Sequence, residues 1–199
     1  MSKPYFFGYG SLVNRATHIY TAAHPARLQG WRRVWRHTAR FSQPILTVEP
    51  CAGSLIEGLI AHVPGGDWAA LDQREIAYDR VPVTKDVHHQ LADAAQRTVQ
   101  TPAQTTVDIA TYYVPETKHP APAAPLPILL SYLDVVVQGY LREFDEAGVA
   151  AFFDTTHGWH APVRNDRAAP IYPRHQSLSS AEQDLVDHHL HRVGGKYVD

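Results

Sequence analysis

The sequence predicts an α+β fold, in which a small, mixed and barrel-like sheet of about five strands is flanked by helices. Short apolar segments rich in β-branched and aromatic residues recur up to residue 114, separated by glycine and proline clusters as strands are by turns. Two short helical patterns interrupt them, and amphipathic helical patterns follow after residue 127. The chain of 199 residues is long enough for one well-buried core, so we expect a single domain over 1–199.

The first strand is predicted over the apolar run 5–8 and breaks at a glycine-rich segment. That segment consists of Gly8, Tyr9, Gly10, Ser11 and Leu12. Because glycine has no Cβ, it lets a ligand approach the main chain closely. The segment is therefore either a loop of N–H groups that can hold a carboxylate, a phosphate or a developing oxyanion, or a tight turn whose glycines only relieve strain.

Asn14 is expected to cap a short helix that runs to about 20–23 and ends before Pro25. The segment 26–36 mixes apolar and cationic residues and is predicted to be a strand, bent at Gly30, with its arginines exposed. Two further strands are predicted at 45–49 and 54–63, the second stopped by Pro64-Gly65-Gly66.

Asp67 is expected to cap a helix over 68–76, which places Glu75 in its last turn. A carboxylate there opposes the helix dipole, at a cost of about 1 kcal/mol or less when exposed. Such a local misfit can mark a functional position. Strands are then predicted at 78–87 and 107–114, with 91–104 between them as a surface excursion or a short helix.

Four prolines make 118–127 a stiff, extended connector. The helix predicted next, over 128–146, carries apolar residues three and four apart and must pack on the sheet, so the connector lies within one domain. Helical pattern continues over 149–154, and 155–173 is irregular. Ser179 or Ser180 caps a last helix to about Val193, with Glu182 in its first turn. We expect about 150–199 to form a C-terminal helical extension packed on the domain.

Composition limits which binding partners and which cellular compartment we expect for the protein. A formal net charge of -2 gives no electrostatic case for nucleic acid or an anionic membrane. No apolar run approaches the roughly 20 residues that span a bilayer. Cys51 is the single cysteine, and no signal peptide is recognised, so we expect a cytoplasmic protein.

The 13 histidines are scattered, and neither His-Glu-x-x-His nor paired Cys-x-x-Cys occurs, so we expect no metal and no cofactor. A Cys51–His nucleophile pair is disfavoured, because the cysteine sits in a Pro-Cys-Ala-Gly turn. Trp159 and the segment 164–167 could fold over a pocket as a lid or simply dock a helix.

Two separated segments resemble the gamma-glutamylcyclotransferase-like proteins. The loop 8–12 matches the family's N-terminal strand ending in Tyr-Gly-Ser, and 71–78 (Leu-Asp-Gln-Arg-Glu-Ile-Ala-Tyr) matches its later Leu-Asp-x-x-Glu helix followed by a tyrosine. The family's central strand is similar to 54–60, and its late helix to 132–139. The resemblance covers most of 4–145, and the residues beyond about 150 lie outside it.

The resemblance implies a five-stranded barrel-like sheet and a reaction in which the α-amino group of a γ-glutamyl compound attacks its own side-chain amide. The products would be 5-oxoproline and an amine or amino acid. By the same match, Glu75 would be the general base and then the acid. The γ-glutamyl pocket would be lined by Tyr9, Gly10, Ser11 and Leu12.

The residue chemistry fits this activity, because one carboxylate with a raised pKa can take the proton of the attacking ammonium and return one to the leaving amine. Of the tyrosines, Tyr78 and one of the adjacent pair Tyr112 and Tyr113 could contact the ligand, and we expect Tyr113 to do so. Glutathione, a γ-glutamyl dipeptide and a γ-glutamylamine all remain possible substrates. The alternative is a non-catalytic family member that binds a small carboxylate or a protein partner.

Overall fold

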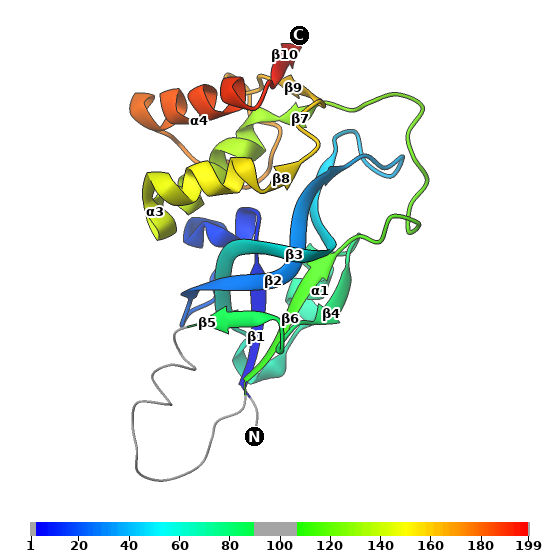
Figure 1. Ribbon diagram of the computed structural model, residues 1–199, viewed down its shortest axis with the longest axis vertical. Coiled ribbons are helices and arrows are strands. Elements are labelled where there is room, and N and C mark those ends of the chain that lie inside the picture. The colour runs from blue at the N-terminus through cyan, green and yellow to red at the C-terminus, as the bar shows by residue number, and fades with distance from the viewer. Residues whose placement is uncertain (1–2, 90–106, 199) are drawn as a thin grey trace.

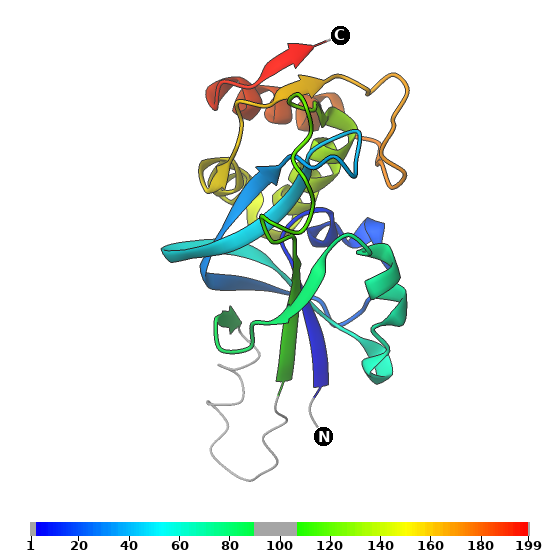
Figure 2. The same cartoon turned by 90° about the vertical axis from the view of Figure 1, so that its right-hand side faces the viewer.

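The computed structural model describes residues 3–89 and 107–198, so the predicted excursion at 91–104 lies outside the described residues. The fold is α+β as predicted, with a curved mixed sheet at one end and two helices, α3 and α4, at the other (Figure 1). The N-terminal end of the described chain lies beyond the sheet and the C-terminal end beyond the helices (Figures 1 and 2).

The main sheet has seven strands instead of about five, in the order β4-β6-β1-β3-β2-β5 with β8 paired to β2. Its strands are β1 Lys3–Gly8, β2 His24–Arg36, β3 Ile45–His62, β4 Asp79–Pro82, β5 Val87–His89, β6 Val107–Tyr113 and β8 Thr156–His157. β1 is central, because it runs parallel to β6 and antiparallel to β3. Phe6 and Phe7 on β1 are fully buried, so the segment after Gly8 leaves the middle of the core.

The strands predicted at 45–49 and 54–63 are one continuous strand, β3, because β2 pairs with it along both halves. The register shifts between Gln29 and Trp31, and Gly30 has φ +80°, which confirms the predicted bend. The prediction that all the arginines of β2 are exposed is wrong, since Arg33 is only 1% exposed. The reason is the irregularity at Gly30, where one residue of β2 lies opposite residues 51–54 of β3 and after which the other side of β2 faces inward.

The helix predicted after Asn14 does not form. Two 3₁₀ turns, η1 Ser11–Val13 and η2 Arg15–Thr17, take its place, and the chain becomes extended at His18. Asn14 does cap η2 by accepting a hydrogen bond from the Ala16 N–H at 3.1 Å. Its Nδ2 donates to the carbonyl of Val135 on α3, and this buried contact competes with helix continuation.

The central helix is shorter than predicted. α1 spans Ala69–Arg74 after the 3₁₀ turn η3 Pro64–Gly66, and its N-cap is Trp68 instead of the predicted Asp67. The Asp67 side chain lies one residue earlier and accepts from the Ala69 N–H at 3.0 Å. Glu75 is therefore the residue at which the helix ends, with non-helical backbone angles. The strand predicted at 78–87 is split into β4 and β5 by a turn at Val83, whose carbonyl accepts from the N–H of Asp86.

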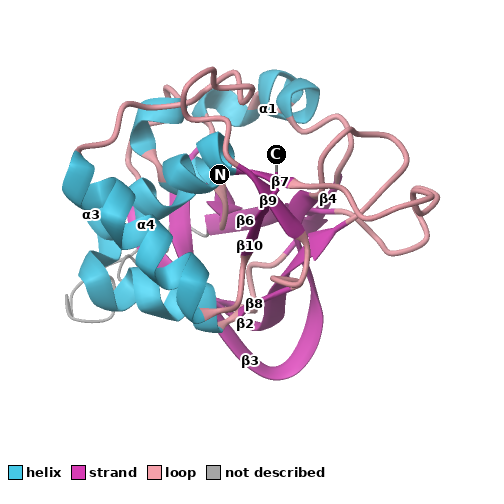
Figure 3. Ribbon diagram, turned by 90° about the horizontal axis from the view of Figure 1, so that it is seen from above, coloured by secondary structure: helices cyan, strands magenta, loops and turns pink. Residues whose placement is uncertain are grey.

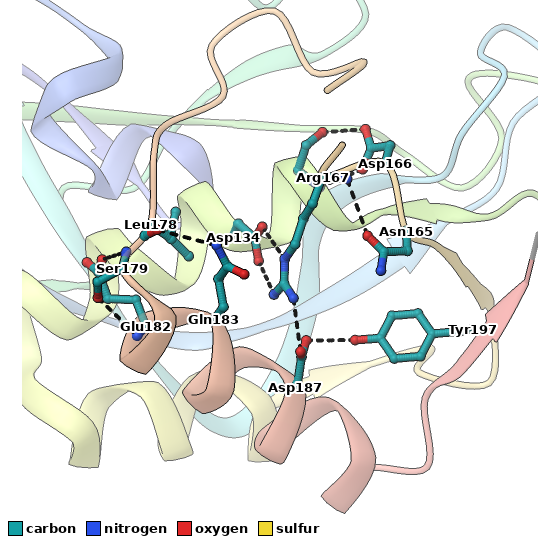
Figure 4. A network of polar contacts seen from close by, with 11 residues as sticks. Asp134, Asn165, Asp166, Arg167, Leu178, Ser179, Glu182, Gln183, Asp187 and Tyr197 are labelled. Atoms are coloured by element: carbon teal, nitrogen blue, oxygen red, sulfur yellow. Dashed lines mark hydrogen bonds and ion pairs between the residues drawn. The ribbon is translucent and has the colours of Figure 1, made fainter. Parts of the chain in front are cut away.

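The long helix α3, Leu130–Asp154, includes both helical segments predicted there and is broken at Asp145, which has φ +57°. One face of α3 packs into the core, with Leu133, Val136, Val137 and Tyr140 fully or almost fully buried. α4, Ser180–Arg192, packs against α3 (Figure 3). Its predicted start is confirmed by a capping box between Ser179 and Glu182 (Figure 4).

The segment 155–173, predicted to be irregular, contributes the short strands β8 and β9. A second, three-stranded sheet joins β10 Lys196–Val198, β9 Pro162–Arg164 and β7 Ile128–Leu129. Among the described helices, none combines the length and the apolar character that crossing a membrane requires.

Candidate active site

A cavity opens where the central strand β1 ends. Its narrow inner pocket, of about 40 Å³, is lined by Phe7, Gly8, Tyr9, Gly10, Ser11, Leu12, Leu46, Glu75, Tyr78, Tyr112 and Tyr132. A wider outer pocket, of about 200 Å³, is lined by Ser11, Trp35, Phe41, Gln43, Pro44, Ile45, Leu46, Arg74, Glu75, Ile76, Ala77, Tyr78, Leu129, Tyr132, Tyr172 and Arg174. Five residues line both pockets, so the two form one site with an inner and an outer part.

Glu75 lies at the junction of the two pockets. Its backbone is held on both sides, because its N–H donates to the Leu71 carbonyl at 2.9 Å and its carbonyl accepts from the Tyr78 N–H at 2.8 Å. The side chain is 16% exposed, and burial raises the pKa of Glu75 while the cations of Arg74 and Arg174 lower it less. The site thus contains a fixed carboxylate that is a stronger base than an exposed one.

Arg74 joins the two halves of the site. Its Nε lies 3.2 Å from Oε1 of Glu75, and its other nitrogens donate to the Thr17 carbonyl at 2.9 Å and the Ser11 hydroxyl at 3.3 Å. The Arg74 side chain is 11% exposed, so water screens these contacts little. One guanidinium therefore positions the carboxylate relative to the loop 8–12.

Gly10 lies where the loop passes close to α3, so a side chain there would displace the Tyr132 hydroxyl. A Cβ on Gly10 would lie 2.7 Å from the hydroxyl oxygen of Tyr132. The Tyr9 side chain turns into the core, where its hydroxyl donates to the Tyr112 carbonyl at 2.6 Å. The turn η1 that follows begins with N–H groups that have no acceptor within the turn.

The buried side chain of Arg33 holds the backbone of the loop 8–12 at Tyr9. Its Nε donates to the Tyr9 carbonyl at 3.2 Å, and a terminal nitrogen donates to the Tyr140 hydroxyl at 2.6 Å and to the Glu57 carbonyl. A second terminal nitrogen bonds the Thr155 hydroxyl at 2.8 Å. Within the described part of the chain, no carboxylate pairs with Arg33. Carbonyl and hydroxyl oxygens bond this buried cation, and it also lies over the rings of Tyr140 and Phe152, at 5.0 and 5.2 Å from their centroids.

The tyrosines of the inner pocket are partly those expected from the sequence. Tyr78 lines it and donates to the Leu46 carbonyl at 3.0 Å. Tyr112 lines it as well and donates to Asp72 at 2.5 Å, whereas Tyr113 lines neither pocket and packs on Trp31 at 5.7 Å between ring centroids. The two neighbours face opposite sides of β6 because side chains alternate along a strand.

Sequence reasoning missed Tyr132 as a site residue. Its ring lies in the first turn of α3 and lines both pockets. Burial raises the pKa of both Tyr78 and Tyr132, so each hydroxyl keeps its proton at neutral pH and can donate a hydrogen bond. The available signal was the position of Tyr132 beside the apolar stripe of a helix that had to pack on the sheet.

The C-terminal extension reaches the outer pocket through Tyr172 and Arg174. Tyr172 packs edge-on against Tyr132, with ring centroids 5.0 Å apart. Trp159 does not cover the pocket. It is 8% exposed and stacks on Phe153 at 4.9 Å, which fits the docking interpretation of this segment.

The remaining candidate groups lie apart from the cavity. Cys51 lines neither pocket, and its sulfur accepts from the Ser54 hydroxyl at 3.1 Å. Over 3–89 and 107–198, no three His, Cys, Asp or Glu side chains are arranged to hold a metal ion.

Comparison with known structures shows the same fold in several proteins. A protein named gamma-glutamyl cyclotransferase superposes with a TM-score of 0.53 at 14% identity, covering 94% of this chain and 99% of its own. An uncharacterised protein from Homo sapiens gives 0.54 at 14% identity, with the same coverage. YkqA from Bacillus subtilis gives 0.51 at 21% identity, covering 79% of this chain and 57% of its own. At these identities the likeness concerns the fold.

No curated protein matches the sequence. Residues 6–127 match the family described as gamma-glutamyl cyclotransferase, AIG2-like. The matched range is more than half of the chain and contains both the loop 8–12 and Glu75. The chain therefore belongs to the gamma-glutamyl cyclotransferase, AIG2-like family.

Proposed function

We propose that this protein cyclises the γ-glutamyl group of γ-glutamyl amides or peptides to 5-oxoproline and releases an amine or amino acid. The observation that carries the proposal is the shared lining of the inner pocket, where Glu75 faces the same small space as the loop 8–12. A partly buried carboxylate beside a loop of N–H donors matches the two requirements of the reaction, which are proton transfer and stabilisation of an oxyanion.

Glu75 acts on the nitrogen atoms. Its carboxylate takes a proton from the substrate's α-ammonium group, and the free amine attacks the γ-amide carbon. A new C–N bond closes the five-membered ring, and the carbonyl electron pair moves to oxygen. When the carbonyl re-forms, the old amide C–N bond breaks and the leaving nitrogen is protonated. Two protons pass in total from the attacking to the leaving nitrogen, and the Glu75 carboxylate is regenerated.

The loop 8–12 acts on the oxygen atom. Its N–H groups stabilise the tetrahedral oxyanion, with Tyr9, Gly10, Ser11 and Leu12 holding the γ-glutamyl group curled. Arg33 and Tyr140 both bond the Tyr9 carbonyl, so the loop backbone is fixed before the substrate binds. Preset donors of this kind require little reorganisation during the reaction, and ring closure benefits from the intramolecular approach of the two groups.

The tyrosine hydroxyls complete the polar lining. Tyr132 donates to a substrate oxygen from the boundary of the inner and outer pockets, because its hydroxyl keeps its proton at neutral pH. The proton of the Tyr78 hydroxyl is used on the Leu46 carbonyl, so Tyr78 offers the substrate its oxygen as an acceptor. Tyr112 takes the place in the inner pocket that the sequence suggested for Tyr113. The steps use only side chains and backbone groups of the chain.

Glu75→Gln is the direct test. The variant is nearly isosteric but cannot accept a proton, so the rate of 5-oxoproline formation from a panel of γ-glutamyl compounds is expected to fall about 10²–10⁴-fold, or roughly 3–5 kcal/mol in activation free energy. Glu146→Gln is the matched control, because Glu146 is exposed on α3 and lines neither pocket. Full activity in the Glu75 variant would refute the assigned role.

Stability provides the control for folding. Since burial raises the pKa of Glu75 above its value in the unfolded chain, the wild-type protein loses stability as the pH rises through the folded-state pKa. The Glu75→Gln variant has no such loss. Its melting temperature at neutral pH should therefore equal or exceed that of the wild type, which separates lost chemistry from lost structure.

A further inference from the structure

The outer pocket combines an apolar wall with positive charge. Its apolar side chains come from β2, the loop before β3, β7 and the segment after α1, namely Trp35, Phe41, Pro44, Ile45, Ile76 and Leu129. Two cations, Arg74 and Arg174, face one carboxylate, Glu75. If the γ-glutamyl group occupies the inner pocket, this space receives the group that leaves.

The two arginines are not equivalent. The Arg74 guanidinium is already bonded to Glu75, Thr17 and Ser11. Arg174 is exposed at the mouth of the pocket, and among the described residues no carboxylate lies within ion-pair distance of it. Its charge nevertheless reaches Glu75, where it lowers the pKa of the carboxyl group. Arg174 is thus a cation beside the site that is available to a ligand.

The backbone that carries Arg174 is anchored. The buried Asp166 accepts from the Ser131 N–H at 2.8 Å and its hydroxyl at 2.5 Å, at the start of α3, and from the Ile171 N–H at 2.9 Å. The Tyr172 N–H donates to the Ser131 hydroxyl at 3.2 Å. A turn from Tyr172 to His175, closed by a 3.1 Å backbone hydrogen bond, then presents Arg174.

A second anchor to α3 is Arg167, the residue after Asp166. Arg167 forms two 2.8 Å bonds to Asp134 on α3 and a 2.9 Å bond to Asp187 on α4, which also accepts from the Tyr197 hydroxyl at 2.7 Å (Figure 4). Asp134 is 4% exposed, so its bidentate pair with Arg167 is shielded from water. The chain is therefore attached to α3 before Arg174, through Asp166, Arg167 and Tyr172. It is attached again after Arg174, where the Ser177 carbonyl accepts from Nε2 of Gln138 on α3 at 3.1 Å.

From this arrangement we infer that Arg174 is a specificity-determining residue that binds a carboxylate on the leaving group. The preferred substrates are then γ-glutamyl conjugates of apolar amino acids, with the apolar side chain against the wall of the outer pocket and the carboxylate on Arg174. γ-Glutamylamines, which lack that carboxylate, are the poorer substrates. This inference rests on the proposed cyclisation and adds the identity of what is released.

Two matched substrates test it. γ-L-Glutamyl-L-phenylalanine and γ-L-glutamylphenethylamine differ only by the carboxylate, and 5-oxoproline reports the turnover of both. We expect the wild-type protein to have a kcat/KM at least about tenfold higher for the first. Arg174→Gln should lower kcat/KM about tenfold for the phenylalanine conjugate and less than about twofold for the amine conjugate. Arg174→Lys should keep part of the preference, because it retains the charge.

Arg142→Gln is the matched control, since Arg142 is exposed on α3 and lines neither pocket. Equal effects of Arg174→Gln on both substrates, or a wild-type protein without preference or preferring the amine, would overturn the inference and leave the cyclisation standing. If the wild-type protein forms no 5-oxoproline from either conjugate but does so from other γ-glutamyl compounds, the assignment of Arg174 fails and the cyclisation stands. If it forms none from any compound of the panel, the proposed function fails, and the assignment of Arg174 fails with it.

Discussion

The buried pair Arg33 and Tyr140 allows a quantitative test of how the loop 8–12 is held. Both side chains reach the same two carbonyl oxygens, those of Tyr9 and Glu57. The Tyr140 hydroxyl lies 3.0 Å from the first and 2.8 Å from the second. A hydroxyl has one proton and can serve only one carbonyl at a time, whereas the guanidinium can serve both.

The expected changes in the free energy of unfolding follow from these two shared acceptors. Tyr140→Phe leaves Arg33 bonded to both carbonyls and should lower the free energy of unfolding by about 1 kcal/mol. Arg33→Met leaves Tyr140 to bond one carbonyl and the other without a donor from this pair, which costs roughly 1–3 kcal/mol. The double variant leaves both carbonyls without a donor from this pair, whereas the 2.6 Å bond from Arg33 to the Tyr140 hydroxyl is lost in each single variant and is counted twice in their sum. These two effects oppose each other, so the loss of the double variant should equal the sum of the single losses within about 1 kcal/mol.

Urea unfolding of the four proteins of this double-mutant cycle gives the three differences. The 5-oxoproline assay supplies a second measurement, in which Arg33→Met should lower kcat/KM more than Tyr140→Phe, because only the first removes the guanidinium from the Tyr9 carbonyl. A loss of stability from Arg33→Met no larger than that from Tyr140→Phe would refute the idea that the guanidinium is the main donor to the two carbonyls.

Two further predictions concern the site itself. Gly10→Ala should lower kcat/KM about tenfold, because its Cβ would lie 2.7 Å from the Tyr132 hydroxyl oxygen. In a Tyr132→Phe background the same substitution should lower kcat/KM by a smaller factor. An equal loss of kcat/KM in both backgrounds would contradict the steric explanation. As the pH is lowered, kcat/KM should fall when Glu75 becomes protonated, at a pH above the ordinary carboxyl pKa of 4.5. Arg74→Gln should move this fall to higher pH, because it removes a cation that lowers the pKa of Glu75. An unmoved acid limb in the pH profile of that variant would count against Arg74 as the partner of the carboxylate.

Local patterns predicted most elements of the fold, but they could not determine which side of a strand faces inward. In β2, Ala26 and Leu28 are buried before the bulge, and Arg33 and Trp35 after it. The buried positions change from even to odd numbers at Gly30, which has φ +80° and lies opposite residues 51–54 of β3. If the alternation of β2 is continued through Gly30 without the irregularity, Arg33 is placed on the exposed side of the strand. In the structure Arg33 is buried and bonds the Tyr9 carbonyl of the loop 8–12.

The candidate site was likewise predicted only in part from the sequence. Short motifs identified Glu75 and the loop 8–12, because the residues of each are adjacent in the chain and share a recognisable order. Tyr112 and Tyr113 could not be separated, since their roles depend on the pairing of β6 with its neighbours. Arg174 could not be placed at all, because a hydrogen-bonded anchor between Asp166 and the start of α3 brings it to the pocket from far along the chain.

The anchored segment also has an evolutionary consequence. The groups proposed to close the ring all lie within the family match at 6–127, except Tyr132, whereas the turn that presents Arg174 lies beyond it. Mutations in that turn can therefore alter which compound is processed while the ring-closing groups stay unchanged. A lineage could diversify its substrates by drift in this short stretch, provided that Asp166 continues to tie it to α3.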